Sequence, residues 1–156
     1  MGLLIVRVDD RLIHGQVIEG WCKTLCINHI IVSNDIVAGD EMQKALLSMA
    51  VPSHIKISVL TIRETADLFL KEDYKKERIL VLASSPADVL SLIKKGVRIK
   101  ELNIGGLHYI YGKVQVDKSI SLSERDMEAL REIERSGVRI EVRVLPGDPK
   151  AGIDVS

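Results

Sequence analysis

Short apolar segments alternate with longer amphipathic segments along most of the chain. The short segments are rich in isoleucine and valine, which is typical of buried strands. They span residues 2–8, 28–33, 54–60, 78–83 and 101–105. The longer segments repeat apolar residues at the spacing of a helix face, and they span residues 14–26, 40–50, 61–71, 86–95 and 123–136. This alternation predicts a series of strand–helix–strand units.

Residue types that favour helix ends support these boundaries. Pro86 stands in the first turn of its helix, where proline is tolerated. Ser123, with an acid three residues later, predicts an N-terminal cap, and Gly137 predicts the end of the same helix. Residues 138–145 alternate apolar and charged side chains. We expect this last strand to lie at the edge of the sheet, antiparallel to its neighbour.

The fold class that follows is α/β. Crossovers of this kind require a mostly parallel sheet, so we predict an open, twisted sheet with helices on both faces. The chain of 156 residues fits one domain, residues 1–156, and we expect residues 149–156 to form a loose tail. Ligands of such sheets bind at the carboxyl ends of the strands, so a site is expected in the loops after the strands.

Charge and composition exclude several classes of partner. Lysine plus arginine number 22, as do aspartate plus glutamate, so no overall field attracts nucleic acid or an anionic membrane. No segment has the features of a signal peptide or reaches membrane-spanning length, and we expect a cytoplasmic protein. Cys22 and Cys26 lie near His29, but no fourth ligand stands at a recognised spacing. We interpret both cysteines as core residues and predict no metal site.

The loop after the first strand gathers the polar chemistry of the chain. The stretch VDDRLIHGQV places Asp9, Asp10 and Arg11 in this loop and His14 at the start of the first helix. A helix N-terminus and an arginine favour an anion such as a phosphoryl group, and a neutral imidazole is a nucleophile. His14 could therefore bind a phosphate or carry one covalently, with Asp10 holding one ring nitrogen. The same residues also fit a structural role in which either aspartate caps the helix and Arg11 pairs with an acid.

The stretch resembles the phosphorylation segment of the IIB components of the mannose/fructose/sorbose family of the bacterial phosphoenolpyruvate-dependent sugar phosphotransferase system. Trp21 on the same helix is part of the resemblance, which continues through residues 30–35, 102–109, 112–116 and 129–148. The resemblance implies that His14 accepts a phosphoryl group from a phosphohistidine of a IIA component. It then passes the group to a sugar held by membrane IIC and IID components. Family behaviour assigns the phosphorylation to Nδ1.

The resemblance also implies roles for other residues. Arg11 would stabilise charge on the phosphoryl group, and Asp10 would orient His14 or tune its basicity. Backbone amides of Gly15 and Gln16 would complete the cradle. Loops after later strands would line its rim with Ser33, Asp35, Ser84, Gly105 and Gly106. For these rim residues a tight turn or a helix cap is the structural alternative. No cofactor is expected.

The resemblance implies three partners: the IIA donor, the membrane components and their sugar. It also implies peripheral association with the membrane transporter, and homodimers are common in the family. Ile18 and Trp21 are candidates for an exposed docking surface, and a core position is the alternative for Trp21. One departure concerns Ile110 and Tyr111, which stand where many members have an arginine and a polar neighbour. Two alternatives therefore stay open: a regulatory phosphocarrier without sugar transport, and a non-catalytic phosphate- or nucleotide-binding module. Because the chain has no P-loop and no dinucleotide-binding glycine motif, a nucleotide is the weaker ligand.

Overall fold

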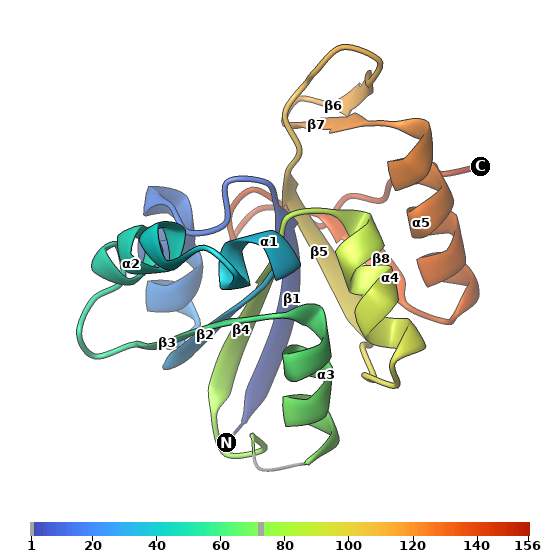
Figure 1. The fold of residues 1–156 in the computed structure, drawn as a ribbon. Coiled ribbons are helices and arrows are strands. Elements are labelled where there is room, and N and C mark those ends of the chain that lie inside the picture. Colours follow the sequence, from blue (N-terminus) through green and yellow to red (C-terminus); the bar gives the residue numbers. More distant parts are fainter. Residues whose placement is uncertain (1, 72–73) are drawn as a thin grey trace.

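A six-stranded parallel sheet forms the centre of the fold in the computed structural model, which describes residues 2–71 and 74–156 (Figure 1). Its strands are β1 (Leu3–Asp9), β2 (His29–Ser33), β3 (Lys56–Leu60), β4 (Arg78–Ala83), β5 (Glu101–Gly106) and β8 (Arg139–Val142). They lie in the order β3-β2-β4-β1-β5-β8, and every neighbouring pair is parallel. The predicted α/β class is confirmed, and β1 takes a central place in the sheet.

Helices cover both faces of this sheet, as predicted. They are η1 (Gln16–Cys22, wound as a π-helix), α1 (Asp35–Ala38), α2 (Glu41–Met49), α3 (Ile62–Leu70), α4 (Pro86–Lys94) and α5 (Glu124–Arg135). Because side chains alternate along a strand, one sheet supplies two cores. Ile79 and Val81 of β4 pack with α3, α4 and α5, whereas Leu80 and Leu82 pack with η1 and α1.

The last strand corrects one expectation. β8 is an edge strand, but it runs parallel to β5. Alternating polarity indicates that one face of a strand is exposed, but it gives no information about the direction of the strand. The direction follows from α5, which returns the chain from the carboxyl edge of the sheet to its amino edge before β8 begins (Figure 1).

The antiparallel pair β6 (Val114–Asp117) and β7 (Ile120–Leu122) was not predicted, nor was the short helix α1. The pair stands above the carboxyl edge of the sheet (Figure 1). All four residues of β6 are exposed, so its apolar residues do not report a buried face. In the segment expected to be a loose tail, Ala151 exchanges two backbone hydrogen bonds with Val142, and Val155 is buried.

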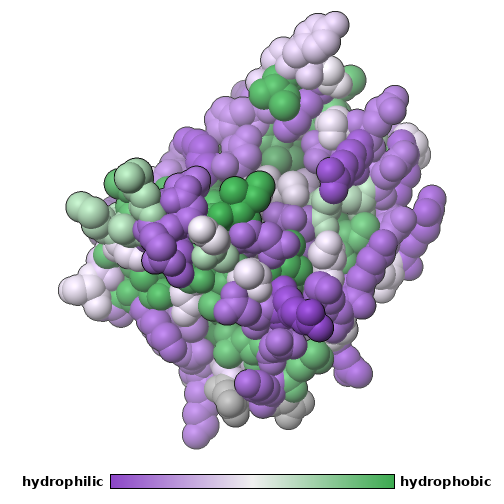
Figure 2. Space-filling view, viewed as in Figure 1, coloured by the Kyte–Doolittle hydropathy of each residue, from purple (hydrophilic) through white to green (hydrophobic). Residues whose placement is uncertain are grey.

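Exposed apolar side chains gather over α1 and α2 (Figure 2). They belong to Ile36, Met42, Leu46 and Met49. Among residues 2–71 and 74–156, no helix has the length and apolar character to cross a membrane.

Candidate functional site

The site begins inside β1, where two charged residues point to the same face of the sheet. Arg7 and Asp9 are two positions apart, and both side chains are 0% exposed. Asp9 also shapes the loop that follows, because its Oδ1 accepts a hydrogen bond from the Arg11 amide at 3.1 Å and its carbonyl accepts one from Leu12. Leu12 adopts a positive φ of 58°, a strained conformation for a leucine. This tight turn brings His14 back toward the end of β1.

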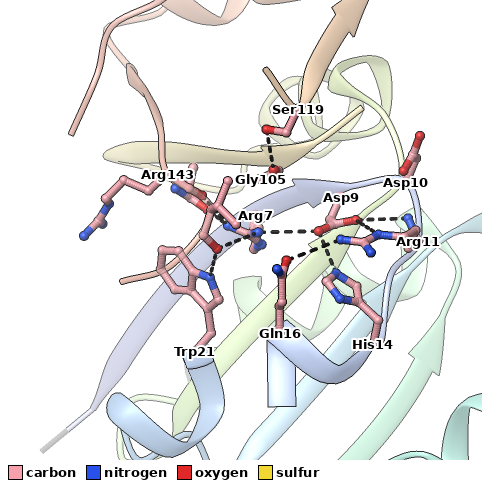
Figure 3. A network of polar contacts seen from close by, with 12 residues as sticks. Arg7, Asp9, Asp10, Arg11, His14, Gln16, Trp21, Gly105, Ser119 and Arg143 are labelled. Carbon is pink, nitrogen blue, oxygen red and sulfur yellow. Dashed lines mark hydrogen bonds and ion pairs between the residues drawn. The ribbon is translucent and has the colours of Figure 1, made fainter. Parts of the chain in front are cut away.

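His14 lies against Asp9 (Figure 3). Its Nε2 is 2.8 Å from Asp9 Oδ2, and its side chain is 14% exposed. Within the described part of the chain, no hydrogen bond engages Nδ1. A buried carboxylate that accepts a hydrogen bond from Nε2–H fixes the tautomer in which Nδ1 carries the free lone pair. The imidazole is therefore held in one orientation with its nucleophilic nitrogen available.

Arg11 stands beside this pair with its guanidinium partly in solvent. Its Nε is 3.7 Å from Asp9 Oδ1, its Nη2 is 3.5 Å from Gln16 Oε1, and its side chain is 47% exposed. A guanidinium with this exposure keeps donors free for an anion near His14. Arg11 and Gln16 thus meet through their side chains, whereas the role expected of Gln16 from the sequence used its backbone amide.

Asp10 does not take the role expected of it. Its Oδ1 contacts His108 Nδ1 at 2.6 Å, and its Oδ2 accepts a hydrogen bond from the His108 amide at 2.8 Å. The Asp10 amide donates to the carbonyl of Gly106. The residue that orients His14 is Asp9, and Asp10 instead ties the site loop to the segment after β5. The partner of Asp10 is therefore His108.

Arg7 lies behind Asp9, in the interior. Its Nη2 is 3.4 Å from Asp9 Oδ2, and its guanidinium donates to the carbonyls of Arg143 and Val144 at 2.9 and 3.2 Å and to the side chain of Asn103. Burial lowers the pKa of Arg7 from its ordinary value to about 10, and the nearby Asp9 opposes this shift. Arg7 therefore remains a cation at neutral pH.

Trp21 closes the interior side of the network. Its ring lies between two guanidinium groups, 4.7 Å from Arg7 Cζ and 5.2 Å from Arg143 Cζ, and its Nε1 donates to the carbonyl of Val144 at 2.9 Å. The indole is fully buried. It is a core residue, and the expectation that it is exposed for docking is wrong; Ile18 is partly buried.

Gly105 explains why β5 carries a glycine beside Arg7. A Cβ on residue 105 would lie 1.9 Å from Arg7 Cζ, so any side chain there would displace the guanidinium. A Cβ on Gly106 would lie 3.5 Å from Asp9 Oδ1, which is an ordinary contact. Gly105 thus makes room for the network behind the site, and it also lines the polar cavity next to Arg11.

A polar cavity of about 380 Å³ opens next to Arg11. Its lining includes Arg11, Gln16, Gly106, Lys118 and Ser121. Two cations, an amide and a hydroxyl suit an anionic or hydroxylated group. The cavity extends the site from the first loop to the β6–β7 pair.

The remaining predicted rim residues lie elsewhere. Asp35 and Ser84 line a second cavity of about 420 Å³, at the ends of β2 and β4. Asp35 Oδ1 accepts from the amide of Ile62 and Ser84 Oγ accepts from Asn34, so both serve helix entries. Ser33 is buried, and among the residues that the structure describes its Oγ has no hydrogen-bond partner.

The charge of this second cavity opposes a phosphate. Burial, and then the charge of Asp35, raise the pKa of Asp88, which also lines it. Three carboxylates (Asp35, Asp88 and Asp126) and one guanidinium (Arg125) line this cavity, so acidic groups outnumber the cation and disfavour an anion. The structure therefore separates Asp35 and Ser84 from Arg11, Gln16 and Gly106, which the sequence had grouped in one cradle.

The cysteines and His29 form no metal centre. Among the residues that the structure describes, no group of three or more histidine, cysteine or acidic side chains could hold a metal ion. Cys22 is buried, as expected, but Cys26 is exposed. His29 contacts Glu77 and Ser58.

Comparisons with known proteins agree with the fold. The family model of the sorbose-subfamily IIB component of the phosphotransferase system matches residues 3–155. The sorbose-specific EIIB component of Klebsiella pneumoniae is 38% identical over 153 residues, covering 98% of this chain and 93% of that protein. The mannose-specific EIIAB component of Escherichia coli K12 is 37% identical over 146 residues, covering 94% of this chain but 45% of that protein.

A solved structure has the same architecture. The crystal structure of the IIB domain of the sorbose permease from K. pneumoniae superposes with a TM-score of 0.90 at 38% identity, covering 97% of this chain and 93% of that one. None of these comparisons favours the regulatory or the purely binding alternative.

Proposed function

The chain belongs to the sorbose subfamily of IIB components of the phosphotransferase system, phosphotransferases that carry a phosphoryl group in sugar uptake, and we propose that His14 is the residue that carries it. One observation supports this assignment above the others. His14 Nε2 contacts the buried carboxylate of Asp9 at 2.8 Å, and this leaves Nδ1 as the free nitrogen. The geometry matches the Nδ1 assignment that the family resemblance implies.

The reaction balances with the groups present. The Nδ1 lone pair of His14 attacks the phosphorus of a donor phosphohistidine, and a new N–P bond forms. The donor N–P bond breaks, and its electron pair returns to the donor imidazole. Positive charge that develops on the His14 ring is stabilised by Asp9 at Nε2. No proton has to leave His14 during this step.

Arg11 acts on the phosphoryl group itself. Phosphoryl transfer spreads negative charge over the equatorial oxygens, so catalysis depends on positioning and on cations at those oxygens. The exposed guanidinium of Arg11 lies beside His14, and the polar cavity beyond it has room for the group's oxygens. Backbone amides of Gly15 and Gln16 complete the proposed cradle.

We infer that the donor is a IIA component and that the acceptor is a sugar bound by membrane IIC and IID components. The E. coli relative whose name joins IIA and IIB in one chain supports the donor assignment. In the second transfer a sugar hydroxyl attacks phosphorus, the N–P bond of His14 breaks, and its electron pair returns to Nδ1. The hydroxyl proton passes to a base of the membrane partner or to water.

Intact-mass spectrometry at alkaline pH tests the assignment. The protein is incubated with phosphoenolpyruvate, the general phosphotransferase proteins and a IIA component, and the expected product carries one acid-labile phosphoryl group. His14→Ala should abolish this product. His54→Ala is the matched control, because His54 is exposed in the segment before β3 and should leave labelling unchanged. Labelling of the His14 variant would overturn the assignment.

A further inference from the structure

Arg7 is the one buried charge of the network for which the transfer reaction provides no direct task. It has no access to the phosphoryl group, since its side chain is fully buried behind Asp9. It nevertheless contacts Asp9 Oδ2, the same oxygen that contacts His14 Nε2. Arg7 can therefore affect His14 only through Asp9.

The position of Arg7 is fixed from several sides. Its guanidinium donates to two backbone carbonyls and to Asn103, and it stacks on Trp21. Gly105 leaves the space that the guanidinium occupies. So many contacts around one buried cation hold its charge at a constant distance from Asp9.

We propose that Arg7 is a positioning residue that sets the pH range in which His14 accepts a phosphoryl group, by balancing the charge of Asp9. The proposal rests on the proposed function of His14. With Arg7 present, Asp9 belongs to a neutral pair, and it orients Nε2–H without strongly attracting a second proton to the ring. The lone pair of Nδ1 then stays available near neutral pH.

Removing Arg7 would change the protonation of the ring. Asp9 would become a buried carboxylate without its interior partner, and the nearest group able to neutralise it is His14. A second proton on the imidazole would be stabilised by Asp9, and it would occupy Nδ1. The protonated ring has no lone pair for attack, so acceptance would require a higher pH.

The other charges near this network do not replace Arg7. Glu141 lies in β8 and Arg143 directly after it, and the Arg143 guanidinium donates to the Glu141 carboxylate at 2.6 and 2.7 Å. Asn103 lies between Glu141 and Arg7. Arg11 contacts the other oxygen of Asp9, and from the solvent side. Salt and water screen such an exposed charge more than they screen Arg7.

The pH dependence of two observables tests the proposal in Arg7→Met. The first is the pH at the midpoint of the chemical-shift change of the His14 ring protons, measured by NMR. We expect this midpoint to rise by about 1 unit. The second is the ratio of parent to variant acceptance rates, which cancels the titration of the donor. This ratio should be largest at low pH and should shrink as the pH rises.

Arg143→Met is the matched control. Arg143 stacks on the other face of Trp21 and is partly buried, but it has no contact with Asp9. Its loss should lower stability while the His14 midpoint stays at the parent value. Arg7→Lys keeps the charge, so its midpoint should lie closer to the parent than that of Arg7→Met.

Two outcomes would overturn the proposal: an unmoved midpoint in Arg7→Met, or an acceptance rate lowered by one factor at every pH. If Arg7→Met does not fold, Gly105→Ala replaces it, because the added Cβ displaces the guanidinium and should raise the midpoint in the same way. Failure of the parent protein to become phosphorylated would count against the proposed function alone. The NMR midpoints would still decide the role of Arg7.

Discussion

One carboxylate oxygen of Asp9 contacts both Arg7 and His14, and the other accepts a hydrogen bond from the amide of Arg11. A single buried side chain therefore holds the imidazole, a buried cation and the turn that leads to the helix. Each of these contacts needs the ionised form, which accepts hydrogen bonds with both oxygens.

Asp9→Asn should reduce phosphoryl acceptance by about 100-fold, because an amide gives His14 neither the charge nor the tautomer that the reaction needs. The measurement is the initial rate of mass gain with a phosphorylated IIA donor. Asp10→Asn is the comparison, since Asp10 contacts His108 instead of His14. Equal losses in the two variants would contradict the role given to Asp9.

The sequence pointed to the right loop but to the wrong aspartate. Prediction ended the first strand at residue 8, whereas β1 continues through Asp9. One further strand residue turns the Asp9 side chain to the face of Arg7 and leaves Asp10 as the first loop residue. The spacing of Arg7 and Asp9 within an apolar strand was the signal available, because two charges on one face of a buried strand indicate a pair.

At the scale of elements, the end of η1 has a geometry that usually requires glycine. The Ile27 amide donates to the carbonyl of Cys22 and the Cys26 amide donates to that of Lys23, which is the hydrogen-bond pattern of a Schellman motif. Cys26 takes the left-handed position, with φ 54°, and its side chain is exposed. The non-glycine residue costs stability without a packing contact to offset it.

Cys26→Gly should therefore raise the free energy of unfolding by about 1 kcal/mol. Urea denaturation measures the change. Cys26→Ala removes the same thiol but keeps a Cβ, so it should bring no such gain. A stabilised alanine variant would show that the thiol, and not the backbone conformation, is the source of the cost.

Other elements show which helix boundaries can be predicted from the sequence. The cap at Ser123 was predicted and is confirmed, with Asp126 completing a capping box. The apolar pattern predicted one ordinary helix over residues 14–26, but Gln16–Cys22 are wound as a π-helix, which is rare and which the pattern did not reveal. Helix α1 has four residues, too few to establish a period.

At the scale of the molecule, strand order assembles the site from distant segments. β1 lies between β4 and β5, so the loop that carries His14 meets Gly106 at the end of β5 and His108 just after it. The alternation of segments predicted a parallel sheet and hence this edge. It could not predict which neighbouring loops contribute to the site. Ser84 follows β4, which also pairs with β1, and yet it lines a different cavity.

The buried His29 links the stability of the whole fold to pH. Burial lowers the pKa of His29 below its ordinary value of 6.5, although its contact with Glu77 opposes the shift. Because the folded pKa is depressed, the unfolded chain binds the proton more readily. Stability is fully present above about pH 6.5 and is lost as the pH falls below it toward the folded pKa.

His29→Gln should thus lose less stability than the parent between about pH 7.5 and about pH 5.5, a window above the usual range of carboxylates. Urea midpoints at both pH values measure the difference. His54→Gln, an exposed histidine, should behave like the parent. An identical pH dependence in the parent and His29→Gln would contradict the role of His29.

The stacking of Trp21 between two guanidinium groups has an optical consequence. Trp21 is the single tryptophan of the chain, and one of its two stacked cations contacts the carboxylate that holds His14. The emission of an indole responds to the electric field of nearby charges. Any shift of Arg7 during loading or unloading of the site changes that field, so the protein contains its own fluorophore for following turnover without a label.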